Sequence, residues 1–409
     1  MKKVFFTLAG GEIGARSLQV LAVVLLTRKV GMGSIGDYGL ATSIAAYALL
    51  LVNQGFDTIA VRASAQKDVE PRSAAEAIIG LRLVAALAIT AATGLWAIFR
   101  PADPAARLLL ILSGSYFSAA ITPRWLYLAT SRPRPLAAAA TLSQACLLIG
   151  VLTVRGPADL SRAAWAQVAG EAATAIYLWT SAGCFRPRLK GTFSRFLMAE
   201  SWPVTLSLIM GTALYNFDLV ALGLFGRRVE VGPYLSSYRC ITVFGPLLAA
   251  LQSTILPRFA EGWPDFKAIR RRVEFISLGV FSGMSLAAVF LFLFAPAILR
   301  LLYGPEIGPS ASLLRILAWM LPVQGLRAVL RQALWAFRGQ RADLRNVALS
   351  TLTNISLDLA LIPHFGAAGC AWSTLAAESV FLAGTWFALA ARERSSFRGS
   401  EGGSNGAAE

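Results

Sequence analysis

Four arginines interrupt long apolar stretches of this sequence, where a charged side chain needs either an ion-pair partner or a functional role. A charge at the centre of a membrane helix costs about 2.5–3.5 kcal/mol on insertion scales, and such residues commonly mark ligand or ion pathways. The planar guanidinium fork binds two phosphate or carboxylate oxygens at once. These charges therefore predict a site for an anionic ligand, with Arg16, Arg82, Arg239 and Arg327 as its candidate residues.

Two of these arginines, Arg16 and Arg82, also have a structural interpretation. Glu12 precedes Arg16 by four residues, so a helix would place both on one face as a self-neutralising ion pair. Arg82 lies deep in its apolar stretch, and snorkelling toward the interface is its alternative. Arg327 shares a polar helix face with Gln324. For Arg16 the ligand and ion-pair interpretations stand side by side.

Three aspartates lie in comparable apolar surroundings. Asp57 follows Asn53, and Asp358 follows Asn354, by four residues, so each amide shares a helix face with its carboxylate. A transporter coupled to protons or sodium needs a carboxylate whose affinity for protons is raised by burial. Asp57, Asp218 and Asp358 are therefore candidate ion-coupling residues, with hydrogen bonding between helices as the alternative.

The inventory of other reactive side chains argues against several functions. His364 is the single histidine, and Cys146, Cys184, Cys240 and Cys370 show no metal-ligand spacing. We therefore expect no metal site. Catalysis by a Ser/His or Cys/His pair is also unexpected, because the sequence has a single histidine. The sequence has no Gly-x-x-x-x-Gly-Lys-Ser/Thr loop, so we expect no bound nucleotide and no other cofactor. We do not expect an enzyme.

The elements that must position these side chains are membrane helices. Of the 409 residues, 56% are hydrophobic and 15% charged, with a mean hydropathy of +0.60, whereas soluble domains carry roughly a quarter charged residues. The net charge of +16 comes from short basic clusters between apolar stretches, a pattern that sets membrane orientation and does not indicate nucleic-acid binding. No cleavage site follows the first apolar stretch, so we expect it to be a retained helix.

Twelve apolar segments are long enough to cross a bilayer. Lipid forces each into a helix because the backbone must satisfy its own hydrogen bonds. With the N-terminus inside, the cytoplasmic connections hold most of the 38 Lys and Arg residues, which predicts an all-α polytopic protein with both termini cytoplasmic. The expected spans are 5–26, 36–58, 75–99, 106–127, 135–154, 162–182, 197–224, 232–256, 274–302, 310–335, 343–363 and 367–390.

The two halves of the sequence resemble each other weakly. Residues 58–62 and 254–258 share the pattern T-I-x-x-R, and Tyr38 corresponds to Tyr234 at the same spacing. Residues 164–171 and 371–378 share A-W-x-x-x-A-x-E. The repeat predicts two parallel six-helix lobes, pseudo-symmetric around a central cavity. The predicted domains are an N-terminal lobe (1–185), a cytoplasmic linker (186–196), a C-terminal lobe (197–391) and a disordered cytoplasmic tail (392–409).

Several short segments resemble a known transporter family. They are GMGSIGDYG (31–39), NFD (216–218) with VGPY (231–234), LPRFA (256–260), LYG (302–304) and LIPHFGAAG (361–369). Together they resemble the Wzx-type oligosaccharide flippases of the multidrug/oligosaccharidyl-lipid/polysaccharide (MOP) superfamily, and the likeness covers nearly the whole chain.

The resemblance implies two lobes that open alternately to either side of a bacterial inner membrane. It implies a cargo of polyprenyl-pyrophosphate-linked oligosaccharide, flipped to the outer leaflet for O-antigen, capsule or exopolysaccharide synthesis. It places basic cavity residues on the helices of Arg16 and Arg239. Besides the lipid-linked cargo and membrane lipids, polysaccharide polymerase or export machinery is a candidate partner.

Three alternatives stay open. A drug or cation exporter of the same superfamily would prefer an acidic or apolar cavity, which the arginines disfavour. The related lipid II flippases have fourteen helices rather than the twelve predicted here. A polysaccharide polymerase or ligase belongs to a different class and needs a large external loop with catalytic groups, which the short connections do not supply.

Overall fold

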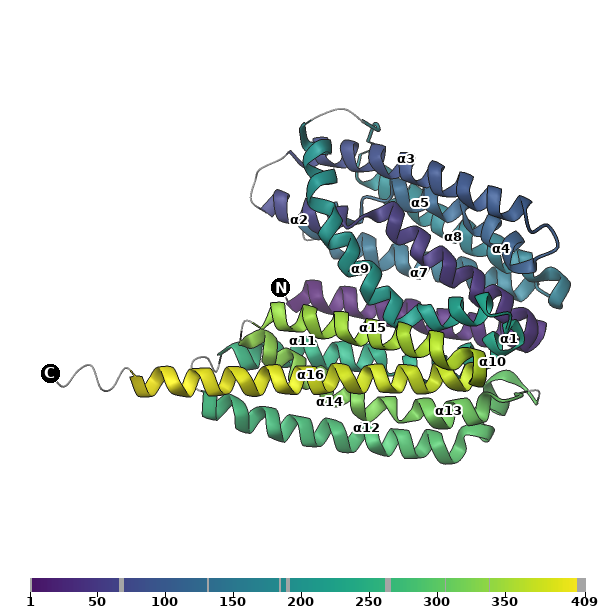
Figure 1. Ribbon diagram of the computed structural model, residues 1–409. Helices are drawn as coiled ribbons and strands as arrows, with labels where there is room; N and C mark the ends of the chain where they lie inside the picture. The colour runs from purple at the N-terminus through teal and green to yellow at the C-terminus, as the bar shows by residue number, and fades with distance from the viewer. Residues whose placement is uncertain are drawn as a thin grey trace. The chain divides into compact units, whose positions relative to one another are not determined.

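The protein is built from α-helices, as the sequence predicts. The computed structural model describes residues 2–65, 70–130, 132–183, 185–188, 192–261, 266–305, 307–337 and 339–402. Within these ranges the regular elements are all helical, and no β-strand occurs (Figure 1).

Every segment predicted to span the membrane is helical. The N-terminal half forms α1 (Lys2–Asn53), α2 (Phe56–Ala65), α3 (Pro71–Ile98), α4 (Pro104–Leu112), α5 (Gly114–Ile121), α6 (Arg124–Ala129), α7 (Pro133–Thr153) and α8 (Leu160–Ser181). The C-terminal half forms α9 (Thr192–Leu224), α10 (Arg228–Thr242), α11 (Gly245–Glu261), α12 (Phe266–Tyr303), α13 (Ser310–Ala318), α14 (Met320–Ala336), α15 (Gln340–Phe365) and α16 (Ala367–Gly402).

Breaks divide several of these helices at places that hydropathy does not reveal. Within α1, Gly31 is non-helical with φ 79° and ψ 170°, a conformation that only glycine adopts without strain. This break lies between the first two predicted spans. The predicted span 232–256 divides into α10 and α11 at Val243 and Phe244, which leaves helix-terminal backbone groups inside a predicted membrane segment.

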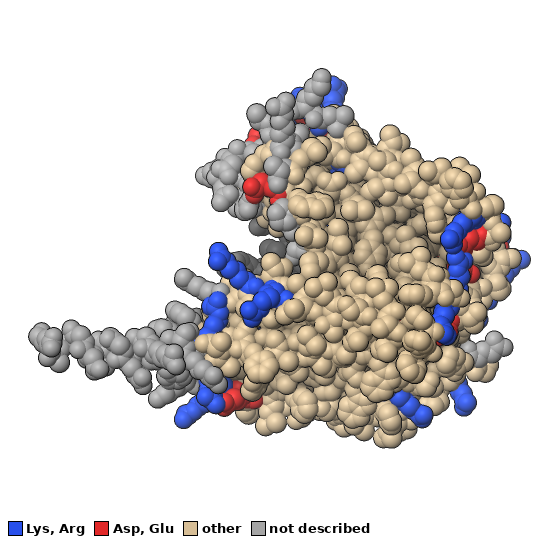
Figure 2. Space-filling model, viewed as in Figure 1, with Lys and Arg blue, Asp and Glu red and all other residues tan. Residues whose placement is uncertain are grey.

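The surface of the protein suits lipid. Seven described helices are long and apolar enough to cross a membrane, or eight if the bent pair Val204–Ala213 and Asn216–Leu224 forms one span. One of them, Gly14–Val61, covers 48 residues, whereas a single span needs roughly 20. On the visible face, charged side chains gather near helix ends and leave long uncharged stretches between them (Figure 2). The chain is a multi-pass membrane protein, and its total of twelve spans stays a prediction.

The chain divides into two compact units. One comprises Met1–Thr212 with Leu302–Glu306, and the other comprises Ala213–Leu301 with Ile307–Glu409. In the first unit α7 packs against α1 and α8, and in the second unit α16 packs against α14 and α15. The division falls within α9, and the predicted lobe boundaries stay predictions.

The C-terminal end of the chain differs from the expected disordered tail. α16 continues through residue 392 as far as Gly402, while residues 403–409 lie outside the described part. Ala391, Arg392, Glu393 and Arg394 are all good helix formers, so they extend the last membrane helix instead of ending it.

Candidate functional site

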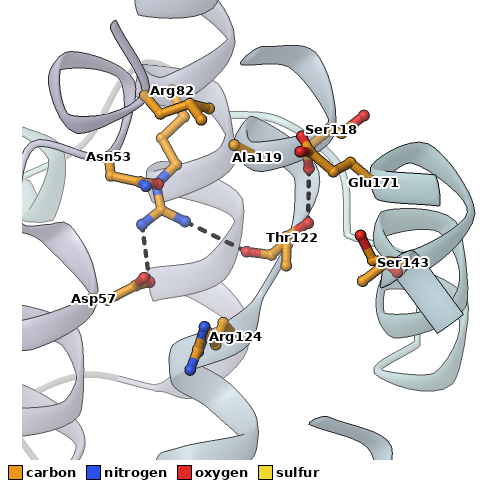
Figure 3. A pocket seen from close by; sticks show the side chains of 11 residues that line it. Asn53, Asp57, Arg82, Ser118, Ala119, Thr122, Arg124, Ser143 and Glu171 are labelled. Carbon is orange, nitrogen blue, oxygen red and sulfur yellow. Dashed lines mark hydrogen bonds and ion pairs between the residues drawn. The ribbon is translucent and has the colours of Figure 1, made fainter. Parts of the chain in front are cut away.

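The first unit contains a pocket of about 240 Å³ that is lined mainly by residues with polar side chains (Figure 3). Helices α1, α2, α3, α5, α6, α7 and α8 or their ends all contribute to it. All lining residues except Leu49 and Ala119 are polar or charged: Asn53, Asp57, Arg82, Ser118, Thr122, Arg124, Ser143, Glu171 and Thr174. Such convergence inside an otherwise apolar helix bundle is costly unless the groups serve one another or a ligand.

An ion pair joins two sides of this pocket. Arg82 Nη2 lies 2.8 Å from Asp57 Oδ1, and Arg82 Nη1 donates to the carbonyl of Thr122 at 3.4 Å. The Arg82 side chain is 1% exposed and that of Asp57 is 35% exposed, so Arg82 forms the floor and Asp57 lies toward the mouth. Arg82 Nε has no hydrogen-bond partner among the described residues. The structure thus pairs a predicted cavity cation with a predicted coupling carboxylate.

A second polar chain leads to the other carboxylate of the pocket. Tyr38 Oη donates to Gln167 Oε1 at 2.6 Å, and Gln167 Nε2 donates to Glu171 Oε1 at 3.1 Å. Gln167 and Glu171 lie one turn apart on α8 because their spacing is four residues. Gln167 thereby holds one carboxylate oxygen of Glu171, and Ser115 of α5 is a further polar neighbour of this carboxyl group.

In the second unit, a buried cluster of carboxyl and hydroxyl groups surrounds Asp218 of α9. Tyr234 Oη donates to Asp218 Oδ2, and Thr374 Oγ1 donates to the same oxygen at 2.8 Å. The Tyr234 and Thr374 hydroxyls lie 3.1 Å apart. All three side chains are at most 2% exposed. Helices α9, α10 and α16 therefore meet at one carboxylate.

Asp358 of α15 extends the same cluster. Ser373 Oγ donates to Asp358 Oδ1, and Asn354 Nδ2 donates to Ser373 Oγ at 3.2 Å. The carboxyl groups of Asp218 and Asp358 are themselves neighbours. Three buried oxygens, Asp218 Oδ1, Asp358 Oδ2 and Asn354 Oδ1, have no donor among the described residues. Several acceptor oxygens without donors are the chemistry of a proton or hard-cation site.

The internal repeat shows that the fold itself does not require these acids. Tyr38 bonds Gln167 in the first unit, and Tyr234 bonds Thr374 at the corresponding positions of the second. At the spacing that relates Tyr38 to Tyr234, the counterpart of Asp218 is Ala22. At the spacing of the A-W-x-x-x-A-x-E segments, the counterparts of Asn354, Asp358 and Cys370 are Leu147, Val151 and Ala163. All four counterparts belong to one buried apolar cluster.

Arg327 is neutralised within the second unit. Arg327 Nε lies 2.9 Å from Glu378 Oε2, and Gln324 Nε2 donates to Glu378 Oε1 at 2.8 Å. The guanidinium also lies over the Phe381 ring, 4.5 Å from its centroid. Arg327 and Glu378 are both buried. This arrangement favours a structural role over the predicted role in binding an anionic cargo.

The other two predicted cations lie in more open positions. Arg16 is exposed on α1, and the side chain of Glu12, its predicted partner, lies outside the described part of the structure. Arg239 is partly buried in the last turn of α10, next to the break that separates α10 from α11. The four predicted arginines therefore divide into two that form buried ion pairs, Arg82 and Arg327, and two that are more exposed.

Sequence reasoning missed several residues of these sites. Tyr234, Ser373 and Thr374 complete the acidic cluster, and Arg124 completes the polar pocket. Tyr234 and residues 371–378 are positions of the internal repeat, but no sequence spacing relates them to Asp218. A change from apolar to polar between repeat counterparts finds Ser373, whose counterpart is Ala166, but not Tyr234 or Thr374, whose counterparts Tyr38 and Gln167 are also polar.

Comparison with known proteins assigns the family. Residues 1–263 match the family described as polysaccharide biosynthesis protein. A protein of Haloferax volcanii, named as a probable low-salt glycan biosynthesis flippase, Agl15, is 24% identical over 231 residues, which is 55% of this chain and 48% of that protein. The chain thus spans about half the length of this curated relative.

Solved structures share the fold. A lipid II flippase, MurJ, in an inward closed conformation, aligns with a TM-score of 0.77 at 16% identity, covering 94% of this chain and 87% of that one. An inward-facing multidrug resistance transporter of the MATE family, within the MOP superfamily, aligns with a TM-score of 0.72 at 14% identity, covering 92% and 95%. The family match covers more than half of the sequence, and this chain belongs to the polysaccharide biosynthesis protein family.

Proposed function

We propose that the protein is a flippase that moves a polyprenyl-pyrophosphate-linked oligosaccharide from the cytoplasmic to the outer leaflet of a bacterial inner membrane. The observation that carries the proposal is the combination of a polysaccharide biosynthesis family sequence with a transporter fold. In this proposal the protein works by alternating access and catalyses no reaction. The product serves surface polysaccharide synthesis, with the polymerase or export machinery downstream as partner.

The pyrophosphate of the cargo needs cations that can engage and release it. Arg16 and Arg239, one from each unit, are the proposed cations, because the resemblance places basic cavity residues on their helices and both residues are less buried than Arg82 and Arg327. An arginine fork matches phosphate oxygens bidentately, whereas a lysine offers a point charge. We therefore expect Arg239→Ala to reduce transport strongly and Arg239→Lys to reduce it partly, with unchanged membrane insertion. Normal transport by a well-inserted Arg239→Ala protein would contradict the role.

Ion coupling is assigned to Asp218 and Asp358. Their oxygens lie buried with Asn354, at positions where the first unit has apolar residues, and three of those oxygens have no donor within the described residues. Asp57 is a weaker candidate because Arg82 already neutralises it. A proton or a sodium ion taken up by this cluster on one side and released on the other supplies the energy for alternating access.

The test is the leaflet distribution of the lipid-linked oligosaccharide in cells that lack the protein. A glycan-modifying enzyme added outside spheroplasts reports how much of the oligosaccharide is accessible. Accumulation of inaccessible, unpolymerised lipid-linked oligosaccharide is the expected result. Accumulation of accessible repeat units would instead assign the protein to polymerisation or ligation.

A drug or cation exporter is the main competing function. If the protein is such an exporter, its deletion should change neither the accessible nor the inaccessible pool of lipid-linked oligosaccharide, and should increase sensitivity to organic cations. The same deletion strain therefore distinguishes the two proposals, provided that drug sensitivity is measured in parallel with the leaflet assay.

A further inference from the structure

The polar pocket of the first unit offers an alternation of hydrogen-bond donors and acceptors. Asp57 and Glu171 supply carboxylate oxygens, and Asn53 and Arg82 supply donors, including an Arg82 Nε that has no partner among the described residues. The hydroxyls of Thr122 and Thr174 donate to the carbonyls of Ser118 and Ala139 at 2.7 and 3.0 Å. Each of these hydroxyls keeps lone pairs that can accept a further bond.

This lining suits a ligand whose groups both donate and accept. A sugar hydroxyl does both, so one ring can satisfy carboxylates, amide and guanidinium together. A fully ionised phosphate only accepts, and Asp57 and Glu171 offset the charges of Arg82 and Arg124, so the pocket has no net positive charge to attract it. An organic cation gains little, because Asp57 is already paired with Arg82 at 2.8 Å. The chemistry of the pocket therefore selects a saccharide over both charged classes.

The size of the pocket limits how much of a saccharide can enter. Its volume of about 240 Å³ is below the range of about 300–1,000 Å³ typical of drug-sized ligands. That space fits one sugar ring and not an oligosaccharide. Leu49 and Ala119 supply an apolar wall against which the C–H face of a ring can pack.

The pocket opens near interrupted backbone. Gln54 and Gly55 have φ of 46° and 66° at the turn between α1 and α2, and Thr122 and Pro123 separate α5 from α6. By the predicted orientation, both breaks precede cytoplasmic connections. Among the lining residues, Arg124 is exposed and Asp57 is partly exposed, whereas Arg82 and Ser118 are buried. Cargo made in the cytoplasm would therefore meet this pocket first.

We propose that this pocket is a saccharide subsite that receives one sugar ring of the cargo on the cytoplasmic side, with Asp57, Glu171, Asn53 and Arg82 as its hydrogen-bonding groups. The proposal rests on the proposed flippase function, because that function supplies a cargo with sugar residues. It separates recognition of the sugar from binding of the pyrophosphate, the role proposed above for Arg16 and Arg239.

The test is saturation-transfer NMR on the full-length protein in lipid nanodiscs, because maltoside detergents would themselves present sugars. The probes are glucose, galactose, N-acetylglucosamine and rhamnose, with inorganic pyrophosphate and tetraphenylphosphonium as the competing chemical classes. We expect saturable binding of at least one sugar at millimolar concentration. Neither competing probe should displace it.

Three variants place the binding in the pocket. Glu171→Gln removes an acceptor and should weaken sugar binding about tenfold, as expected for a hydrogen bond to a charged group. Thr174→Val removes a lining hydroxyl without changing shape. Ala119→Leu fills the pocket, leaves every hydrogen bond intact and should also weaken sugar binding. It stays informative if Thr174→Val lowers the melting temperature of the protein.

The matched control is Thr180→Val on the same helix. Thr180 is exposed and donates to the carbonyl of Ile176 at 2.7 Å, outside the pocket, so its replacement should leave sugar binding unchanged. Binding that is equal in all variants, absent for every sugar, or displaced by pyrophosphate overturns the saccharide subsite. A deletion strain with normal leaflet distribution overturns the flippase function instead, so the two failures are distinguishable.

Discussion

Asp218 and Asp358 occupy places that the fold fills elsewhere with aliphatic side chains. Burying a carboxylate costs free energy unless it is protonated or paired, and within the described residues no arginine or lysine forms an ion pair with either one. If such a carboxylate is kept for transport at the expense of stability, replacing it with a neutral side chain should make the protein more stable. Replacement by asparagine tests this because the side-chain shape is preserved.

We expect Asp358→Asn to abolish gradient-dependent transport and to leave the melting temperature equal to or above that of the wild type. The control is Ser379→Ala, an exposed position on the same helix α16 that carries Ser373; it should change neither quantity. Transport in vesicles with an imposed proton or sodium gradient identifies the ion. A large drop in melting temperature with retained coupling would make the cluster a packing feature.

The ion pair of Arg327 with Glu378 leads to the opposite expectation. Removing one partner leaves a buried charge uncompensated, at a cost of about 3–5 kcal/mol. We expect Arg327→Met to lower the melting temperature sharply, and the double variant Arg327→Met with Glu378→Leu to recover much of it. Thermal melts of the wild type, the single variants Arg327→Met and Glu378→Leu, and the double variant measure the coupling energy between the two side chains. If Arg327→Met melts like the wild type but loses transport, Arg327 binds cargo after all.

At the scale of elements, the segment 185–188, which we call the strap, packs against α3. Phe185 is buried, the backbone N–H of Arg188 donates to the carbonyl of Glu76 at 2.9 Å, and Arg188 Nε lies 3.0 Å from Glu76 Oε2. A Cβ at Gly80 would lie 2.3 Å from the carbonyl oxygen of Arg188. The glycine is therefore required by the close approach of two backbones.

Two glycines of α3 give a matched pair of variants. Gly80→Ala should displace the strap and expose the bond after Arg188 to trypsin, with a lower melting temperature; the bond after Arg186 precedes Pro187 and resists trypsin in any case. Gly94→Ala has no atom within 4 Å of the added Cβ, so it should be neutral or stabilising by up to about 1 kcal/mol, as alanine favours the helix. Limited trypsin digestion of inside-out vesicles compares them. Equal digestion of both variants would contradict the strap.

At the scale of the whole molecule, orientation in the membrane is the property still to be measured. The basic clusters predict that residue 186 lies in the cytoplasm and residue 102 outside. In a background without the native cysteines, Ala102→Cys should react with a membrane-impermeant thiol reagent in intact spheroplasts, and Arg186→Cys only after lysis. Both positions are exposed. The reverse labelling pattern would invert the topology and place the proposed saccharide subsite on the wrong face for loading.

The sequence by itself determined the class of the protein. Hydropathy identified the stretches that are predominantly helical, although not the breaks within them, because lipid leaves the backbone no partner other than itself. The weak repeat was enough to relate Tyr38 to Tyr234, and both make corresponding hydrogen bonds. The motifs at 31–39 and 361–369 pointed to the transporter superfamily whose fold the chain shares.

The tertiary structure alone decided which charges meet. Sequence spacing paired Arg16 with Glu12, but it could not pair Arg82 with Asp57 or Arg327 with Glu378, because each of these pairs joins different helices. Hydropathy and helix periodicity are local properties, whereas a contact between helices depends on long-range packing. For the same reason the sequence named Asp218 and Asp358 separately, and only the packing of α9, α10, α15 and α16 showed that they form one buried site.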